Sequence, residues 1–109
     1  MERWINMVEL NCPTREQEFN NWYDKIHLPD TLKTPGFVAA KRFVIEEPRE
    51  GRGKYLTIYE IDTDDIAKTM EIRMAKRAEE YAGGRGSDLW VVIQEPVRYR
   101  QIISLTAQK

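Results

Sequence analysis

Four short segments of this chain carry apolar side chains at both odd and even positions, and this feature most limits how the chain can fold. The segments are residues 3–10, 37–46, 54–61 and 89–94. Successive side chains of a β-strand point to opposite faces of a sheet, so strands of this kind need cover on both faces. We therefore predict a sheet that a single layer of helices cannot cover alone.

Two stretches between these segments carry apolar residues at helical spacing, which gives each helix one apolar stripe to set against a sheet. Proline restrains the residue before it, so we expect the first helix to end or kink at Leu28, before Pro29. The pair Gly83-Gly84 ends the second helix. The first stripe consists of Phe19, Trp22, Tyr23 and Ile26, and the second of Ile66, Met70, Met74, Ala78 and Tyr81.

The resulting order of elements, β-α-β-β-α-β, predicts an α+β fold of the ferredoxin-like type. Residues 1–109 then form a single domain, in which an antiparallel four-stranded sheet carries two helices on one face. Residues 97–105 alternate in polarity and would extend the chain as a further arm. A second copy of the chain is the simplest cover for the other face, so we expect a homodimer that closes into an α/β barrel. The alternative is a monomer with some exposed strand aromatics.

The composition argues against several classes of function. Hydrophobic residues make up 41% of the chain and charged residues 32%, and the net charge is −1. No apolar run approaches the roughly 18 residues of a membrane helix, so we expect neither a membrane nor a nucleic acid as partner. A single histidine and a single cysteine, Cys12, are too few for a zinc site, and an unpaired cysteine favours the cytoplasm. No glycine-rich nucleotide motif is present, so no cofactor is predicted.

Charged residues along the second helix are interpreted as its solvent-exposed face. Arg73 and Arg77 alternate with acidic residues, a pattern typical of a surface helix. In the C-terminal arm Arg98 and Arg100 flank Tyr99, and we expect them on an exposed strand face or in ion pairs between subunits.

The segment from residue 19 to residue 30 has the most chemical content. His27 follows Tyr23 by four residues and Asp24 by three, so the three side chains can lie together on a helix surface. Imidazole is the natural acid or base near neutral pH, and Asp24 would hold its tautomer or raise its pKa. We therefore predict His27 and Asp24 as catalytic residues. The alternative is structural: the ring would cap helix carbonyls or hydrogen-bond Asp24.

Further residues are predicted to line a cleft beside His27. Asn6 lies between Trp4 and Val8 on one strand face, and a buried amide needs partners, of which a ligand is one. Aromatic rings and hydroxyl groups from the other strands would complete a pocket for an apolar or aromatic small molecule. For each of these residues plain packing is the alternative. The predicted substrate-binding residues are Tyr23, Asn6, Trp22, Thr57, Tyr59 and Trp90.

The pattern Phe-x-x-Trp-Tyr-Asp-x-x-His-Leu-Pro-x-x-Leu-x-x-Pro-Gly-Phe, which begins at Phe19, resembles the EthD-like branch of the dimeric α/β-barrel superfamily. The resemblance implies a homodimer with facing sheets, a cleft between sheet and helices in each protomer, and His27 as the usual cleft histidine. Members of the superfamily include cofactor-independent monooxygenases, cyclases, lactone isomerases, haem enzymes and proteins of no known activity. Cyclases with further histidines are a poor guide, because His27 is the only histidine here.

Three functions remain open at this point. The first is an enzyme that acts without nucleotide or metal on an apolar, aromatic or polyketide-like substrate, with His27 as general acid or base. It would be an isomerase, cyclase, decarboxylase or cofactor-free monooxygenase. The second is a protein that binds a small ligand without transforming it, as an accessory of a degradation pathway. The third is a haem-linked oxygenase with His27 as axial ligand.

Overall fold

The first strand of the chain is the one around which the sheet is built. In the computed structural model, which describes residues 1–108, one edge of this strand pairs antiparallel with a single long strand and the other edge pairs with two short ones. The strands are β1 (Glu2–Asn11), β2 (Phe37–Val44), β3 (Tyr55–Thr63), β4 (Val91–Val92) and β5 (Val97–Arg100). Because β2 pairs with β3, the order is β2-β3-β1, followed by β4 and β5 on the far edge of β1.

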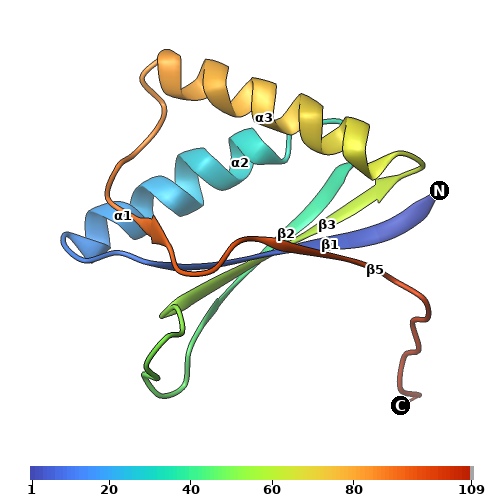
Figure 1. Cartoon of the computed structure of the whole chain (residues 1–109), viewed down its shortest axis with the longest axis horizontal. Coiled ribbons are helices and arrows are strands. Elements are labelled where there is room, and N and C mark those ends of the chain that lie inside the picture. The colour runs from blue at the N-terminus through green and yellow to red at the C-terminus, as the bar shows by residue number, and fades with distance from the viewer. Residues whose placement is uncertain (109) are drawn as a thin grey trace.

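All helical segments lie on one face of this sheet (Figure 1). The first helical rod runs without a break through α1 (Glu16–Trp22), the π-helical turn η1 (Tyr23–His27) and α2 (Leu28–Thr31). The second is α3 (Ile66–Ala82), which begins after Asp65, whose side chain caps the Lys68 N–H. The predicted α+β, ferredoxin-like fold, with two helices on one face of the sheet, is confirmed.

The core lies between the sheet and the helices. Even-numbered residues of β1 and odd-numbered residues of β3 point toward the helices, since they are paired in register. The side chains of Leu10, Phe19 and Ile61 have no exposed surface, and that of Tyr23 has almost none. At about 25 cal/mol per Å² of buried apolar area, burial of each such side chain contributes roughly 1.5–3 kcal/mol.

The sequence predicts that the first helix ends or kinks at Leu28, before Pro29. In the structure the helix instead continues to Thr31. Proline has no N–H and its ring clashes with the carbonyl one turn earlier in a regular helix. Here the preceding turn is widened: the Leu28 N–H donates to the carbonyl of Tyr23, five residues back. The widened turn accommodates Pro29 within the rod, and it places His27 mid-helix rather than in a last turn.

The predicted fourth strand is shortened, and the predicted arm that follows it supplies a second short piece of strand. Of residues 89–94, only Val91 and Val92 pair with β1, whereas part of the predicted arm becomes β5 and pairs alongside. Pro96 separates the two pieces, and a proline cannot donate to a strand ladder. The sheet therefore has five strands rather than four.

A β-bulge in β2 changes which side chains share a face. Phe37 pairs with Ile61, but Ala39 pairs with Glu60, so Val38 is the additional residue. Strict alternation along residues 37–46 would place Phe37 and Phe43 on the same face, and the bulge prevents this. Phe37 is buried under the helices, and Phe43 is on the opposite face, 48% exposed.

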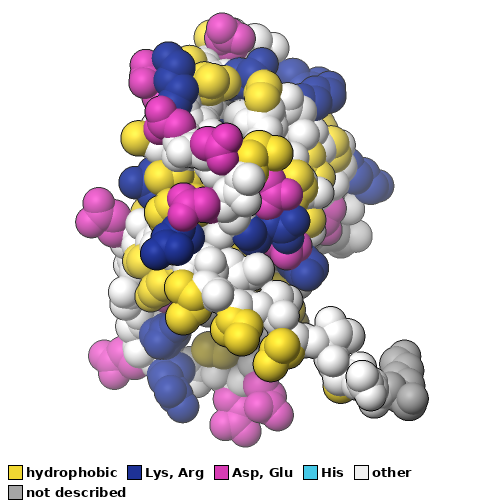
Figure 2. All heavy atoms as spheres, turned by 90° about the vertical axis from the view of Figure 1, so that its right-hand side faces the viewer, with side chains coloured by type: hydrophobic (Ala, Val, Ile, Leu, Met, Phe, Trp, Pro, Cys, Tyr) yellow, Lys and Arg dark blue, Asp and Glu magenta, His cyan; other side chains and the backbone are white. Residues whose placement is uncertain are grey.

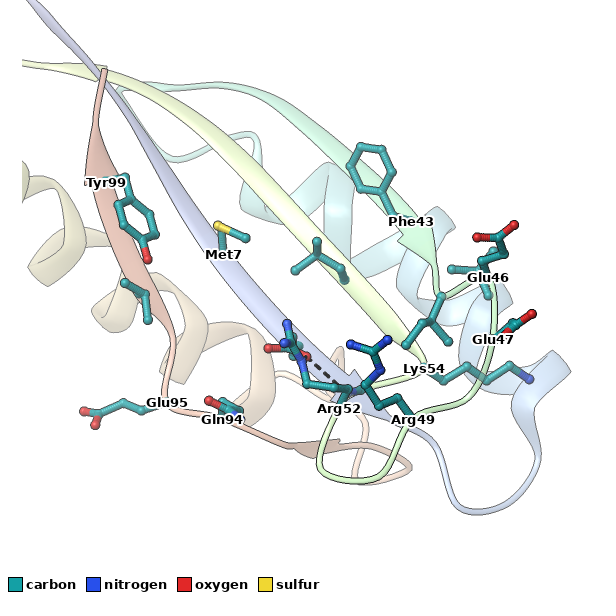
Figure 3. A pocket seen from close by; sticks show the side chains of 16 residues that line it. Met7, Phe43, Glu46, Glu47, Arg49, Arg52, Lys54, Gln94, Glu95 and Tyr99 are labelled. Carbon is teal, nitrogen blue, oxygen red and sulfur yellow. Dashed lines mark hydrogen bonds and ion pairs between the residues drawn. The ribbon is translucent and has the colours of Figure 1, made fainter. Parts of the chain in front are cut away.

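The sheet face opposite the helices is uncovered and largely apolar. Figure 3 shows Met7, Phe43 and Tyr99 on this face, with charged side chains near the turn between β2 and β3. These side chains border a hollow of about 740 Å³. We call this surface the open face; its apolar residues are Ile5, Met7, Phe43, Leu56, Ile58, Val97 and Tyr99.

After β5 the chain leaves the body of the domain, and the side chains of Ile102 and Leu105 are 85% and 87% exposed. Figure 2 shows this tail projecting from the molecule and hydrophobic side chains interspersed with charged ones on the face in view. Within residues 1–108, neither helical rod has the length and hydropathy that crossing a lipid bilayer requires.

Candidate functional site

His27 lies at the end of the π-helical turn and faces the sheet. Its side chain is buried and leaves only 7% of the residue's surface exposed. The ring stacks on Trp22, with 5.0 Å between ring centroids and 24° between planes. Tyr23 meets it edge-on at 4.8 Å and Trp90 lies 5.9 Å away. Three aromatic rings therefore fix the orientation of the imidazole, and turns of this π type recur at functional sites.

A cleft of about 310 Å³ opens in front of His27, between α3 and the sheet. That volume is at the lower end of the range for small-molecule sites. Its lining combines apolar and polar side chains in about equal numbers. The apolar members are Val8, Phe37, Met70, Met74, Trp90, Val92 and Pro96, and the polar members are Asn6, Tyr23, His27, Thr31, Tyr59, Arg73, Arg77 and Arg98.

The imidazole is neutral at pH 7. Burial, and after it the nearby guanidinium groups of Arg73 and Arg77, together lower the pKa of His27 to about 4, against weaker opposing effects of Glu80 and Asp30. Among residues 1–108 no group hydrogen-bonds its ring nitrogens. A neutral ring of this kind offers one acceptor and one donor to whatever occupies the cleft.

Asp24 is not the partner of His27, and the prediction that it orients the ring or raises its pKa is wrong. Its carboxylate accepts a hydrogen bond from Arg42 at 2.9 Å, and its side chain is 54% exposed. The π turn accounts for the difference, because it changes the angular spacing that would place residues three apart together in a regular helix. Arg42 also lies over the Tyr23 ring at 4.5 Å, so this ion pair braces β2 against the helical rod.

Beneath His27 three hydroxyl groups form a buried chain. The Tyr23 hydroxyl is 2.8 Å from the Thr57 Oγ1 atom and 3.4 Å from the Tyr59 hydroxyl. Burial raises the pKa of both tyrosines, so both remain protonated at neutral pH. Thr57 has no exposed surface and does not reach the cleft, whereas both tyrosines do.

The other predicted substrate-binding residues divide into two groups. Asn6 and Trp90 line the cleft, and Asn6 is 8% exposed with no side-chain partner among the described residues. Trp22 lies behind the imidazole rather than in the cleft, and its Nε1 atom donates to the carbonyl of Arg85 at 2.9 Å. Trp22 therefore supports His27 from the far side.

The loop that carries Trp90 is tied to the helical rod by an ion pair. Arg85 donates to both carboxylate oxygens of Asp30, at 2.7 and 3.0 Å. Asp30 is 6% exposed, and its hydrogen bonds from Arg85 lower its pKa. Together with the bond from Trp22, this pair holds the loop after α3 over the imidazole.

Three arginines of the cleft were not recognised from the sequence. Arg73 and Arg77 were interpreted as part of a solvent-exposed helix face, yet Arg73 is 5% exposed and both line the cleft. Arg98 is exposed, as one of its two expected placements has it, but it is opposite Asn6 in the strand pairing and therefore lies on the sheet face that carries the cleft. The available signal was the spacing of Met70, Met74 and Arg77 along one helix stripe, which also contains Arg73.

Comparisons with known proteins place the fold. No protein-family model matches the sequence, and no protein of curated function is similar to it in sequence. Among solved structures, HapK from Hahella chejuensis has a TM-score of 0.67 and 18% identity, with 100% of both chains covered.

Two more solved structures share the fold. An ethyl tert-butyl ether degradation (EthD) family protein from Bacillus halodurans has a TM-score of 0.55 and 19% identity over 94% of this chain and 100% of its own. The oxygenase SnoaB from Streptomyces nogalater, described as cofactor-independent, has a TM-score of 0.54 and 15% identity over 97% of each chain. The fold expected from the sequence resemblance is thus shared with an EthD family protein.

Proposed function

We propose that this protein is an enzyme that moves a proton on an apolar, aromatic or polyketide-like substrate, with His27 as the base and without nucleotide or metal. One observation carries the proposal: the only histidine of the chain is held by three rings at the wall of a cleft, is neutral, and has no hydrogen-bond partner for its ring within residues 1–108. The fold shared with a cofactor-independent oxygenase supports it.

The chemistry follows from the charges around the ring. A substrate C–H bond breaks, its electron pair remains on the substrate as a conjugated anion, and the proton passes to an imidazole nitrogen. The imidazolium that forms is disfavoured by Arg73 and Arg77 in the empty cleft, but the new anion lies among the same groups and offsets that cost. Return of the proton to another atom gives isomerisation. Attack of the anion on a carbonyl carbon of the same substrate gives cyclisation, and its reaction with dissolved dioxygen, as the oxidant, gives oxygenation.

A deuterium-exchange assay tests the proposal directly. Anthrone, a flat three-ring carbon acid, is incubated with the protein in D₂O, and deuterium at its acidic carbon is measured by mass spectrometry. We expect the wild-type protein to accelerate exchange and His27→Asn to lower the rate by about 10²-fold or more, the usual size of general-base catalysis. Asp24→Asn is the matched control and is expected to retain the wild-type rate, since Asp24 pairs with Arg42 outside the cleft.

An equal exchange rate for wild type and His27→Asn would contradict the proposal. Binding of anthrone without exchange would instead favour the second function, a non-catalytic ligand-binding protein; the low pKa of His27, which makes it a weak base, favours that candidate. The haem-linked alternative predicts a Soret band on titration with haemin that His27→Asn removes.

We also propose that the protein is a cytoplasmic homodimer whose subunits meet through the open face. The face is apolar in its centre, it carries the hollow of about 740 Å³, and nothing within residues 1–108 covers it. An apolar surface of this kind on a small domain marks an interface. The cytoplasmic assignment rests on the lone thiol of Cys12, which is buried and donates to the carbonyl of Thr14.

A further inference from the structure

The charges of the His27 cleft are all of one sign. Three guanidinium groups line it, from Arg73, Arg77 and Arg98, and no carboxylate does among the described residues. Arg73 is neutralised from behind the cleft wall, because it donates to both oxygens of Glu80 at 2.9 and 3.0 Å. The other two arginines have no carboxylate within 4 Å anywhere in residues 1–108.

The two unneutralised arginines come from different layers of the fold. Arg77 is on α3, half-buried, with its guanidinium 5.8 Å from the centroid of the Trp90 ring and 5.1 Å from that of Tyr81. Stacking on aromatic rings holds the planar group without using its hydrogen bonds. Arg98 is on β5, opposite Asn6 in the strand pairing, and so points toward the same cleft from the sheet.

From this arrangement we infer that the cleft selects substrates with a flat apolar body and one acidic group, a carboxylate or an acidic phenol, and that Arg77 and Arg98 bind the acidic group. The inference rests on the proposed function, since it names the substrate class of the same site. The apolar lining matches the body, which lies against Phe37, Met70 and Met74. Guanidinium groups with free N–H donors match an anion, and bidentate pairing with a carboxylate is their preferred geometry.

The two guanidinium groups act together on such a group, although Arg77 is only half-buried and Arg98 is exposed. An anion beside two positive groups at a partly buried site is attracted more strongly than in bulk water. A neutral molecule of the same shape would fill the same apolar volume but would leave both guanidinium groups without a partner. The cleft should therefore discriminate by charge between molecules of equal size.

The test uses a matched pair of probes, 2-naphthoate and 2-naphthamide, which share a ring system and differ in charge. Isothermal titration calorimetry at neutral pH is expected to show wild-type protein binding 2-naphthoate about tenfold or more tightly than the amide, the size of one charge-assisted hydrogen bond. Arg77→Gln and Arg98→Gln should each weaken 2-naphthoate binding about five- to tenfold and leave 2-naphthamide binding within about twofold.

Two control variants separate this site from general charge effects. Lys68→Gln removes one positive charge from the exposed surface of the same helix and should change neither affinity. Arg77→Lys keeps the charge and should retain part of the preference for 2-naphthoate. Retained binding of 2-naphthamide in Arg77→Gln shows that the cleft has kept its shape.

Equal binding of the two probes by wild-type protein would overturn the inference and leave the proposed proton-transfer function standing. An unchanged preference for 2-naphthoate in the double variant Arg77→Gln/Arg98→Gln would also overturn it. If neither probe binds, both the inference and the aromatic-binding cleft of the proposed function fail.

Discussion

His27 owes its properties to its neighbours rather than to a dedicated acidic partner. The rings of Trp22, Tyr23 and Trp90 remove water from the imidazole, and Arg73 and Arg77 disfavour its charged form. Both effects lower the pKa of the imidazole and keep the ring neutral at pH 7. Because the folded chain protonates this ring at a lower pH than the unfolded chain does, the free energy of unfolding depends on pH.

We expect the folded state to lose stability as the pH falls from about 6.5 to about 4, because in that range the unfolded chain protonates His27 and the folded chain does not. The contribution is complete above pH 6.5 and amounts to something on the order of 3 kcal/mol at its full extent. Urea unfolding of wild type and His27→Gln at several pH values isolates it, since all other groups are common to both. Parallel curves for the two proteins would contradict the assignment.

At the scale of single residues, the sequence predicts which residues line the cleft more reliably than it predicts which side chains pair with one another. His27, Tyr23, Asn6, Tyr59 and Trp90 reach one cleft, as their types and strand parity suggest. The pairing of Asp24 was not predictable, because a regular helix was assumed where the chain forms a π turn.

The role of the cleft arginines was missed because alternating charges on a helix are the ordinary pattern of a wet surface. The one local signal is that Arg73 and Arg77 share a helix stripe with Met70 and Met74. Only the packing of α3 across the sheet, which is a tertiary feature, turns this stripe inward.

At the scale of the elements, the turn between α2 and β2 is tightly constrained at Gly36. Gly36 has a φ of +95°, and an added Cβ atom would lie 3.2 Å from the Asp62 carbonyl oxygen and 3.3 Å from the Cγ2 atom of Thr69. Its own carbonyl accepts a hydrogen bond from the Asp62 N–H at 2.8 Å. The turn thereby locks the end of the helical rod to β3 and α3.

We expect Gly36→Ala to lower the free energy of unfolding by about 2–4 kcal/mol, because it adds a steric conflict to the cost of a left-handed conformation. Gly84→Ala is the control: its φ is +81°, but nothing lies within 4 Å of the added atom. That variant should lose only about 1 kcal/mol. Denaturant titration measures both, and equal losses would show that the close approach to Asp62 and Thr69 is not limiting.

The β elements show where periodicity is a reliable guide and where it fails. Strands β1 and β3 alternate without interruption, so their buried faces follow directly from the sequence. In β2 a single additional residue, Val38, reverses the parity of everything after it. A bulge has no distinct composition signal, so the orientation of Phe43 could not be read from the chain alone.

For the molecule as a whole, the open face determines the state of assembly. Phe43 and Tyr99 lie on strands at opposite sides of the sheet, are 48% and 56% exposed, and both face away from the helices. A homodimer interface of ordinary size would hide this surface and close the hollow above it.

Sedimentation of the wild-type protein at micromolar concentration is expected to give a dimer. The variant Phe43→Glu/Tyr99→Glu should be a monomer, because it would bury two charges without partners in the interface. Ala67→Glu, on the exposed surface of α3, should remain dimeric. A wild-type protein that sediments as a single chain would contradict the proposed assembly.

The widened turn at Tyr23–His27 leaves one helical rod with two rotational phases. A regular helix advances by about 100° per residue, so one additional residue in a turn rotates everything before it against everything after it. The segment that contains the buried Phe19 and the segment that contains Pro29 and Thr31 are therefore rotated relative to each other about the helix axis. Loss of one residue between them would restore a uniform helix and swing the imidazole out of line with its cleft. The number of residues in Tyr23–His27, more than their composition, therefore determines the direction of the His27 side chain.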